Sequence, residues 1–308
     1  MTETIMKPIL SKEHLGACYA ILSGFLYGFV GYFGVSVVQS SVSVSNMLFW
    51  RFLISSLLIA TLFLFKKNRV FSCRKSMVIA FCNGGIFYAL STMLYFFACP
   101  YIGSGLGMVI FFTYPALVML LNHMIYGQSI PGIYYYAIVI IMIGMLLFVD
   151  TDEVHIDVIG IILAVMSALI YAGYIISSKQ ISALSPTVST LMVCLGCMTT
   201  CLLISIANHS LIIPSTSAIW LHLVGISVLS TTVPILLFLY SLNYISSEKA
   251  SILSVLEPIF VLIFGVTLLN EPMKLQYVIG VVIVLAGALL TLCSSQQRSL
   301  SSSELEQI

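Results

Sequence analysis

Charged side chains are scarce in this sequence. Asp, Glu, Lys and Arg make up only 7% of the 308 residues, whereas 60% of the residues are hydrophobic. A water-soluble domain of this length needs many more charged groups on its surface, so the composition excludes a soluble protein and predicts a surface that faces lipid. The sequence also lacks a glycine-rich phosphate loop and an H-E-x-x-H metal motif. We therefore expect no enzyme activity, no cofactor, no bound metal and no nucleic-acid partner.

Apolar runs close to 20 residues long recur along almost the whole chain. A helix needs about 20 residues, at a rise of about 1.5 Å each, to cross a hydrocarbon core of about 30 Å. Strands of a membrane barrel are about half as long and alternate in polarity, so these runs predict helices. The expected fold is an all-α polytopic membrane protein. Its ten predicted spans are residues 14–37, 46–65, 76–98, 102–124, 132–149, 158–178, 187–207, 217–241, 248–269 and 275–294.

Lys and Arg lie almost entirely on one side of these spans. Ten crossings put both termini on the same side, and the side rich in Lys and Arg is normally cytoplasmic. We therefore expect a multi-pass protein of the cell membrane (the inner membrane in a bacterium) with a cytoplasmic N-terminus at 1–13 and a disordered, serine-rich cytoplasmic tail at 295–308. The opposite side carries Lys274 alone. The predicted cytoplasmic side carries Lys7, Lys12, Lys66, Lys67, Arg69, Arg74, Lys75, Lys179, Lys249 and Arg298.

The chain matches itself at an offset of 143 positions, with one residue of slippage near the start. Matched tyrosines, prolines and glycines carry the evidence, because matches among Leu, Ile and Val arise by chance in apolar helices. The match predicts two five-helix repeats, residues 14–149 and 150–294. An odd number of crossings in each repeat inserts the second copy upside down relative to the first. The matched pairs include Gly16 and Gly160, Ser23 and Ser167, Tyr27 and Tyr171, Tyr101 and Tyr244, Pro115 and Pro258, and Gly144 and Gly287.

Two ionisable residues, Arg51 and Glu257, lie well inside predicted spans. A charge in hydrocarbon is costly unless it is paired or faces water, so both side chains should point inward. Glu257, near the midplane, is a candidate for binding a substrate amine or a coupling proton. Arg51, nearer the outer face, either contacts substrate, snorkels outward or caps backbone carbonyls, and an ion pair with Glu257 is left open. Both charges break the repeat, because Glu257 corresponds to Tyr114 and Arg51 to Cys194 or Leu195.

Three prolines, Pro115, Pro234 and Pro258, lie within spans. Each leaves the carbonyl four residues earlier without its helical donor, and in lipid such a carbonyl needs a partner or a wet cavity. For Pro115 and Pro258, at equivalent positions of the two repeats, we expect cavity lining and gating. For Pro234, neighbouring hydroxyls can satisfy the kink. The carbonyl freed by Pro258, that of Ser254, is a candidate ligand for a cationic group.

Aromatic side chains within the spans are candidates for an apolar substrate pocket with a few hydroxyl groups, as solute sites usually have. Packing or anchoring at the membrane interface is the alternative for each of them. The candidates are Tyr27, Tyr95, Phe111, Tyr114 and Tyr171.

Characteristic segments are spread over the two repeats. They are Arg51 within FWRFLISSLLI, the proline-centred FFTYPALVMLL and VLEPIFVLIFGVTLLNE, and Gly144 and Gly287 late in each fifth span. Over nearly its whole length, the chain resembles the EamA-like family of the drug/metabolite transporter superfamily. The resemblance implies a basket of eight helices around a central cavity, with the fifth and tenth helices at the flanks. The first repeat departs from the pattern, with Gln128 where the second has Glu271, and we interpret that pair as loop and helix-end structure.

These features predict a secondary transporter that moves a small organic metabolite, such as an amino acid or its derivative, across a bilayer by alternating access. Its energy must come from a gradient or from exchange, and protons are a candidate coupling ion. The single Arg51 argues against a multiply anionic substrate, which would need several cations near the site. The alternative is a membrane-embedded receptor or binding protein that keeps the fold without transport.

Overall fold

The computed structural model describes residues 12–38, 42–65, 74–127, 129–149, 157–181, 184–268 and 273–305. All regular secondary structure in these ranges is helical, as the sequence predicts. Gln128, Glu271 and most of the basic loop at 66–73 lie outside the described residues.

Eight helical segments are long and apolar enough to cross a membrane. Two further apolar helices, Gly132–Leu146 and Leu275–Thr291, are shorter and coincide with the fifth and tenth predicted spans. Fifteen residues of helix rise about 22 Å, less than the hydrocarbon core of about 30 Å. The eight long segments are Lys12–Gly34, Val44–Phe65, Arg74–Ile102, Gly105–Tyr126, Val158–Gln180, Pro186–Ala207, Ser217–Ser241 and Ser247–Leu268.

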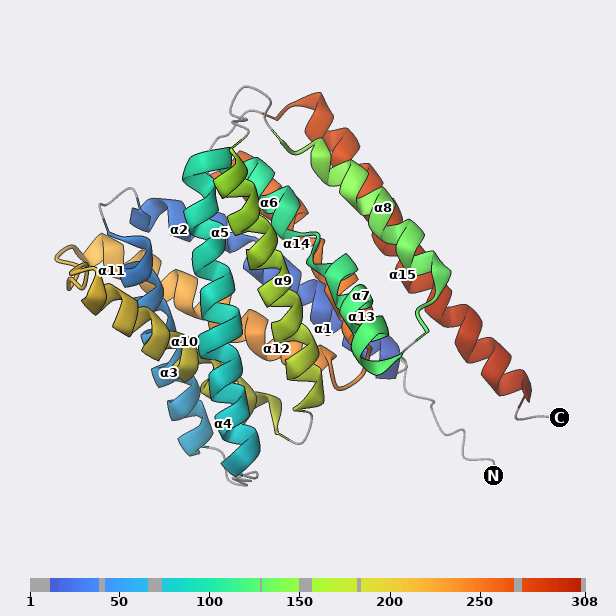
Figure 1. Cartoon of the computed structure of the whole chain (residues 1–308), viewed down its shortest axis with the longest axis horizontal. Helices are drawn as coiled ribbons and strands as arrows, with labels where there is room; N and C mark the ends of the chain where they lie inside the picture. The colour runs from blue at the N-terminus through green and yellow to red at the C-terminus, as the bar shows by residue number, and fades with distance from the viewer. Residues whose placement is uncertain are drawn as a thin grey trace, which may run out of the picture.

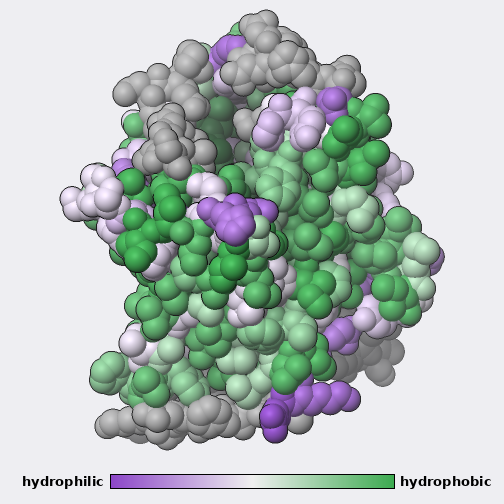
Figure 2. Space-filling view, turned by 60° about the vertical axis from the view of Figure 1, so that its left-hand side comes forward, coloured by the Kyte–Doolittle hydropathy of each residue, from purple (hydrophilic) through white to green (hydrophobic). Residues whose placement is uncertain are grey.

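The outer surface of the molecule suits a lipid environment. Hydrophobic residues cover most of the face in Figure 2, and hydrophilic ones on it are few. Many large apolar side chains are well exposed, among them Leu57, Leu62, Leu120, Ile143 and Leu203. In water such a surface would be unstable, so its natural solvent is the bilayer.

Several spans are interrupted rather than continuous. One consists of α1 (Lys12–Tyr27) and α2 (Phe29–Val38), and two contain π-helical turns. The first π turn, η1 (Asn83–Tyr88), joins α4 (Arg74–Cys82) to α5 (Ala89–Ile102), and the second, η3 (Val228–Thr232), joins α11 (Ser217–Ser227) to α12 (Val233–Ser241). The two turns occupy equivalent places in the repeats, since Tyr88 and Thr231 lie 143 positions apart. Such π turns within helices often occur at functional sites.

Two other spans are broken at their middle by a turn that precedes a proline. In one, α6 (Ser104–Phe111) ends and α7 (Tyr114–Tyr126) begins around Thr113; in the other, α13 (Ser247–Ser254) ends and α14 (Glu257–Leu268) begins around Leu256. The second residues of α7 and α14 are Pro115 and Pro258, whose fixed φ suits the first turn of a helix. Both breaks therefore follow from the same sequence feature at the same position of each repeat.

The close contacts between the two halves occur in matching pairs. Gly16 of α1 packs on Tyr244 and Ile245, because a Cβ added to it would lie 2.6 Å and 3.0 Å from their side chains. Gly160, its match in α9 (Val158–Gln180), packs in the same way on Tyr101 and Ile102 at 2.6 Å each. In each half, a glycine at the equivalent position thus allows close packing against the other half.

Two hydrogen bonds repeat this exchange. Ser23 Oγ donates to the Pro234 carbonyl at 2.8 Å, and Ser167 Oγ donates to the Ser91 carbonyl at 2.7 Å. Ser23 matches Ser167, and Ser91 lies 143 positions before Pro234. Each bond occupies a buried hydroxyl that would otherwise be unsatisfied in the apolar interior.

Figure 1 shows α8 (Gly132–Leu146) and α15 (Leu275–Leu305) side by side along one edge of the molecule, as the family resemblance implies for the fifth and tenth helices. They approach closely through glycines. A Cβ on Gly144 would lie 2.9 Å from the Gly280 carbonyl oxygen, and one on Gly287 would lie 2.9 Å from that of Ala137. The contact positions rise along one helix as they fall along the other, so the pair is antiparallel.

Helix α15 continues to Leu305, through most of the segment for which the sequence predicts disorder. No proline or glycine follows Gly287 to end the helix. The predicted tail at 295–308 is therefore helical over its described part.

Gly196 of α10 (Pro186–Ala207) packs directly on the backbone of the span that contains η1. A Cβ added to Gly196 would lie 2.0 Å from the Phe81 carbonyl oxygen, and the backbone cannot move aside as a flexible side chain would. We expect Gly196→Ala to destabilise the protein by about 1–3 kcal/mol through overpacking. The measurement is the melting temperature of the purified protein in detergent.

The matched control is Gly107→Ala in α6, where an added Cβ would meet its nearest neighbour at an ordinary 3.7 Å. This variant should melt at or slightly above the wild-type temperature, because alanine favours helix more than glycine does. Equal melting temperatures for both variants would contradict the backbone contact at Gly196.

Candidate functional site

A cavity of about 820 Å³ lies between the interrupted spans. Its walls combine one acid, one base and many aromatic rings. Solute sites of membrane and soluble proteins usually fall between about 300 and 1,000 Å³ and share this mixture of apolar walls and a few polar groups. Its inner wall includes Tyr27, Arg51, Tyr88, Thr92, Tyr95, Phe111, Tyr171, Glu257 and Pro258.

The cavity extends toward one face of the molecule, opposite to the face where α1 begins. The lining includes residues at the helix ends of that opposite face: Tyr32 and Gly34 in α2, Val44 at the start of α3 (Val44–Phe65), Pro100 in α5 and Tyr277 in α15. Toward the face where α1 begins, the lining stops near the middle of the spans, at residues such as Tyr171 and Glu257. Such a cavity gives a solute access from one side only.

Glu257 is the first residue of α14, directly after the break in its span. It is partly exposed, and it lines the cavity. Among the described residues its carboxylate has no hydrogen-bond or ion-pair partner. A carboxylate at this depth is costly unless water or a ligand satisfies it, so the position is the strongest candidate for a ligand contact.

Arg51 of α3 is only 3% exposed but contributes to the cavity wall. Its Nη2 donates to the Ser230 carbonyl at 2.7 Å, and its Nε donates to the Thr231 hydroxyl. Ser230 is the residue four positions before Pro234, so the guanidinium satisfies the carbonyl that the proline leaves without a donor. Arg51 therefore caps a backbone carbonyl, one of the alternatives that the sequence leaves open for it. The Ser230 hydroxyl has no hydrogen-bond partner, so the local hydroxyls alone do not satisfy the backbone at the Pro234 kink.

No ion pair joins Arg51 to Glu257 among the described residues, although both line the same cavity. The direct ion pair between Arg51 and Glu257 that the sequence leaves open is therefore not formed in this structure.

Tyrosines form a connected cluster at the inner end of the cavity. The hydroxyl groups of Tyr27 and Tyr88 lie 3.3 Å apart. Tyr171 contacts the ring of Tyr88 with centroids 5.9 Å apart and that of Tyr114 at 4.8 Å, both edge to face. Tyr27 and Tyr171 are repeat equivalents, so the two halves contribute the same residue to the wall.

Some residues predicted for the site are buried outside the cavity wall. Tyr114 is 1% exposed, and its hydroxyl donates to the Ser251 carbonyl at 3.4 Å. The Ser254 hydroxyl donates to the Ala250 carbonyl at 2.9 Å. Pro115 and Pro234 are buried near helix starts and do not line the cavity, whereas Pro258 does.

Tyr88 and Thr92 are wall residues that the sequence alone does not identify. Tyr88 ends the π turn η1 and Thr92 lies one helical turn later in α5. No proline follows η1 as Pro234 follows η3, so the sequence around η1 gives no comparable signal. The repeat offset offers the available signal, because it pairs Tyr88 with Thr231 beside Pro234.

Polar contacts close the face where α1 begins. Lys249 Nζ lies 2.7 Å from Glu13 Oε1, with the lysine side chain 4% exposed. Asn122 Nδ2 donates to Ser247 Oγ at 3.0 Å and to the carboxylate of Glu248. These contacts tie α1 and α7 to the start of α13, so we call them the polar latch.

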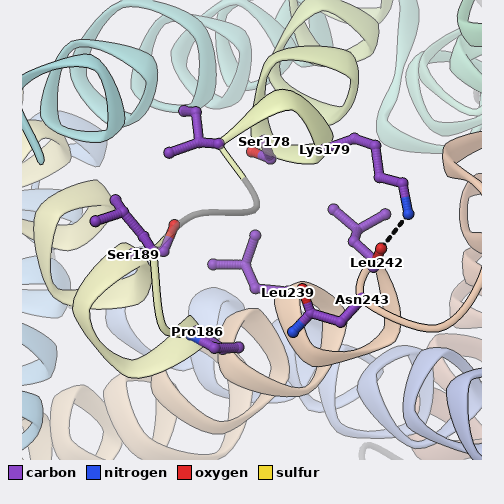
Figure 3. Close-up of a pocket in the computed structure, with 9 residues that line it drawn as sticks. Ser178, Lys179, Pro186, Ser189, Leu239, Leu242 and Asn243 are labelled. Carbon is purple, nitrogen blue, oxygen red and sulfur yellow. Dashed lines mark hydrogen bonds between the residues drawn. The ribbon is translucent and has the colours of Figure 1, made fainter. Parts of the chain in front are cut away.

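Lys179 adds a further contact to this face, at the end of α9. Figure 3 shows its side chain reaching the turn after α12, where its Nζ donates to the Leu242 carbonyl, and it also donates to the Ile245 carbonyl at 2.9 Å. The adjoining gap between Ser178, Ser189 and Leu239 has a volume of about 10 Å³. That is room for about one water molecule, so this gap is no passage for a solute.

Two residues of the latch, Glu248 and Asn122, have no polar counterpart on the opposite face. Positions 143 residues before Glu248 and after Asn122 are Gly105 and Gly265, and both line the cavity. Polar side chains that hold one face closed are thus replaced by glycines where the cavity opens.

A metal site finds no support in the described part of the chain. No three His, Cys, Asp or Glu side chains there are grouped to hold an ion. Cys194, Cys197 and Cys201 are fully buried in α10, and Cys197 donates to the Gly84 carbonyl at 3.2 Å. These cysteines pack as small apolar residues.

Comparison with known proteins assigns this architecture to a family. The model of the EamA-like transporter family matches residues 14–150 and again 158–293, once for each half. The chain belongs to the EamA-like transporter family. The family resemblance seen in the sequence is therefore confirmed, and the chain is a multi-pass membrane protein of the transporter class rather than an enzyme.

Curated relatives of this EamA-like transporter are bacterial and archaeal. An uncharacterized transporter, YxxF of Bacillus subtilis, is 25% identical over 94% of each chain. The pseudopaline exporter CntI of Pseudomonas aeruginosa is 23% identical over 72% of this chain and 76% of its own. A solved crystal structure with 14% identity covers 92% of this chain and 98% of its own with a TM-score of 0.76, which shows that the fold is shared.

The cavity of the EamA-like transporter should be accessible to water-soluble reagents. Cys99 lines it and is partly exposed, whereas Cys194 is fully buried between helices. We expect a small hydrophilic thiol reagent to modify a variant with Cys99 as its single cysteine, and to leave the matching Cys194-only variant unmodified. Intact-mass measurement of the folded protein reads out the modification. Equal reactivity of both variants would contradict the cavity.

Proposed function

We propose that this EamA-like transporter is a secondary transporter that moves a small organic metabolite, such as an amino acid or its derivative, by alternating access through the central cavity. The observation that carries the proposal is the unpaired carboxylate of Glu257 inside that cavity. A packing residue has no need of a charge here, whereas a solute with a cationic group does. CntI, a relative named as the exporter of pseudopaline, supports a small organic cargo.

An inverted-repeat plan with ten crossings accounts for the matching contacts of the two halves. The exchanged glycine contacts of Gly16 and Gly160 and the exchanged bonds of Ser23 and Ser167 support it, and so does the antiparallel packing of α8 on α15. In this plan α8 and the apolar part of α15, Leu275–Thr291, also cross the membrane, as one flank of a thinner or tilted region. Residues 14–149 and 150–294 then form the two repeats.

We place both termini in the cytoplasm, on the strength of the uneven distribution of Lys and Arg. The cavity then opens outward, and the polar latch closes the cytoplasmic face. Opening to the cytoplasm requires Lys249 to leave Glu13, and Glu248 to leave Asn122. A solute bound near Glu257 can then be released on the other side.

Within the cavity we assign substrate contact to Glu257 and Arg51, and an apolar wall to Tyr27, Tyr95, Phe111 and Tyr171. Tyr114 and Ser254 act from behind this wall, where Tyr114 supports Tyr171. Pro115, Pro234 and Pro258 set the breaks and kinks at which the spans bend. Glu257 is also the candidate to carry a coupling proton, because it is the ionisable acid in the described cavity wall.

Substitution of Glu257 by Gln tests the proposal, because it keeps the size and hydrogen bonding of the side chain but removes its charge. If Glu257 binds a substrate amine, the apparent affinity should fall about tenfold or more, in line with the loss of a hydrogen bond to a charged group. If it carries a coupling proton, uphill transport should be lost while exchange survives. The measurement is counterflow of labelled solute in proteoliposomes, repeated over a range of pH.

The matched control is Asp157→Asn. Asp157 accepts from two backbone N–H groups at the start of α9, outside the cavity, and asparagine preserves this cap. Unchanged affinity, exchange and pH dependence in Glu257→Gln would refute the role of Glu257. Binding of a solute without counterflow in the wild type would favour a receptor or binding protein instead.

The polar latch gives a separate prediction about alternating access. Glu13→Lys should place two cations together, open the cytoplasmic face and close the cavity to the outside. In intact cells, an impermeant thiol reagent should then label a single Cys99 several-fold more slowly than in the unmodified latch. Adding Lys249→Glu restores the ion pair with reversed polarity and should restore the labelling rate. A reversed pair that labels as slowly as Glu13→Lys alone would argue against the latch.

A further inference from the structure

Two buried polar groups without partners lie close together outside the central cavity. The side-chain oxygen of Asn83 and the hydroxyl of Tyr174 have no hydrogen-bond partner among the described residues, and the two side chains are only 2% and 1% exposed. Neither residue lines the cavity or the gap beside Lys179. Buried polar atoms without partners are costly and rare in native proteins, so two of them at one place need an explanation.

These groups belong to a cluster between the inner end of the cavity and the face that the polar latch closes, which we call the latch face. Asn83 Nδ2 donates to Ser178 Oγ at 2.9 Å and to the Tyr174 carbonyl at 3.4 Å. The Tyr174 ring centroid lies 5.0 Å from that of Tyr88 and 5.6 Å from that of Tyr171, and both of these residues line the cavity. Ser178 lines the gap of about 10 Å³ at the latch face (Figure 3). The cluster therefore fills the stretch between the cavity and the latch.

The repeat relates this closed cluster to an open part of the cavity wall. Three residues along α1 and α2 line the cavity between its inner end and the open face: Tyr27, Val30 and Gly34. Their repeat equivalents, 144 positions later in α9, are Tyr171, Tyr174 and Ser178. The first of these equivalents lines the cavity as well, whereas the other two are packed shut.

A contact made in both halves supports this alignment. Asn83 corresponds to Ile226, which lies 143 positions later. Asn83 bonds to Ser178, and Ile226 in the same way contacts Gly34, where an added Cβ would lie 3.9 Å from Ile226 Cδ1. The same positions therefore meet in each half, with apolar residues where the cavity is open and polar residues where it is closed. In the inverted-repeat plan the halves exchange conformations when access changes face, so the closed polar positions then line the cavity.

We propose that Asn83, Tyr174 and Ser178 form a second, uncharged polar subsite, which contacts the solute when the cavity opens at the latch face. This inference rests on the proposed transport function and adds a binding site to it. Asn83 Oδ1 accepts a hydrogen bond and the Tyr174 hydroxyl donates or accepts one, so the subsite suits a polar group with N–H or O–H donors. In the described state these atoms are buried without partners. Their cost raises the free energy of that state and offsets part of the cost of opening the latch.

Accessibility of position 178 tests the subsite in the full-length purified protein. Ser178→Cys, as the single cysteine, is treated with a small hydrophilic thiol reagent, and intact mass gives the labelling rate. Adding Glu13→Lys, which breaks the latch, should raise this rate several-fold, whereas the same change should slow the labelling of a single Cys99. The control is a variant with Cys194 alone, which is fully buried in α10 and should stay unlabelled with either latch.

Tyr174→Phe tests whether the hydroxyl is unpaired in one state and bonded in the other. Loss of an unpaired buried hydroxyl should leave the melting temperature unchanged or higher. Loss of its bond in the open state should slow the labelling of Ser178→Cys about fivefold or more. The control Tyr136→Phe, on the exposed face of α8, should change neither measurement. A lower melting temperature in Tyr174→Phe would show that the hydroxyl is bonded in the closed state, against the subsite.

Competition tests contact with a solute. The standard amino acids, each at millimolar concentration, are the probes, added to Ser178→Cys in the Glu13→Lys background. At least one should slow the labelling several-fold, and Asn83→Leu should remove most of this protection, because it deletes the accepting oxygen. Labelling that no amino acid slows would mean that water alone fills the subsite, and would overturn the solute contact.

The two reporters separate failure of the subsite from failure of the proposed function. Ser178→Cys that stays unlabelled with either latch would overturn the subsite. If Glu13→Lys still slows the labelling of Cys99, access alternates and the proposed function stands without this subsite. If the rate at Cys99 is also unchanged, alternating access through the latch fails as well.

Discussion

The hydrogen bond from Arg51 to the Ser230 carbonyl is the interaction on which the site depends. In a lipid-embedded interior, a backbone carbonyl that leaves the helical ladder must find a donor, since no bulk water reaches it. Pro234 removes that donor from Ser230, and the π turn η3 moves the carbonyl toward α3. Arg51 donates to the Ser230 carbonyl, and this hydrogen bond holds the arginine in the cavity wall. With the arginine held there, the described structure has no ion pair between Arg51 and Glu257, and the Glu257 carboxylate keeps no protein partner.

The same scaffold occurs in both halves, but its chemistry differs at selected positions. The exchanged contacts of Ser23 and Ser167 hold the halves together in the same manner. Where the first half has Tyr114 the second has Glu257, and where the first has Tyr88 the second has Thr231. Residues that match between the halves form the contacts that join them. Residues that differ supply the Glu257 carboxyl group and the Thr231 hydroxyl that holds Arg51.

Much of the architecture follows from the sequence because lipid imposes simple rules. Apolar length identifies the helices, the repeat offset aligns Pro115 with Pro258, and the depth of Glu257 marks it as a ligand-binding candidate. Other features depend on packing that no local pattern encodes. The π turn η1 contains no proline, so Tyr88 gives no signal as a wall residue. Tyr114 resembles a wall residue by position, but it is buried outside the cavity wall and packs against the ring of Tyr171 of the other half.

Two lysines that support the predicted membrane orientation also hold helices together. Lys179 and Lys249 support the predicted orientation as members of the basic side, yet both are engaged with other elements: Lys179 with the turn after α12, and Lys249 with α1. A cation at a helix end satisfies the topology rule wherever its amine points, so the rule says nothing of its partner. Their partners make this face costly to open, because Lys249 and Glu248 are almost fully buried and each would lose a charged contact. The opposite face has Gly105 and Gly265 at the places equivalent to Glu248 and Asn122, and a glycine has no side chain to form such a contact. In the proposed alternating-access cycle, the loss of the buried charged contacts is therefore a cost of opening the face that holds the latch.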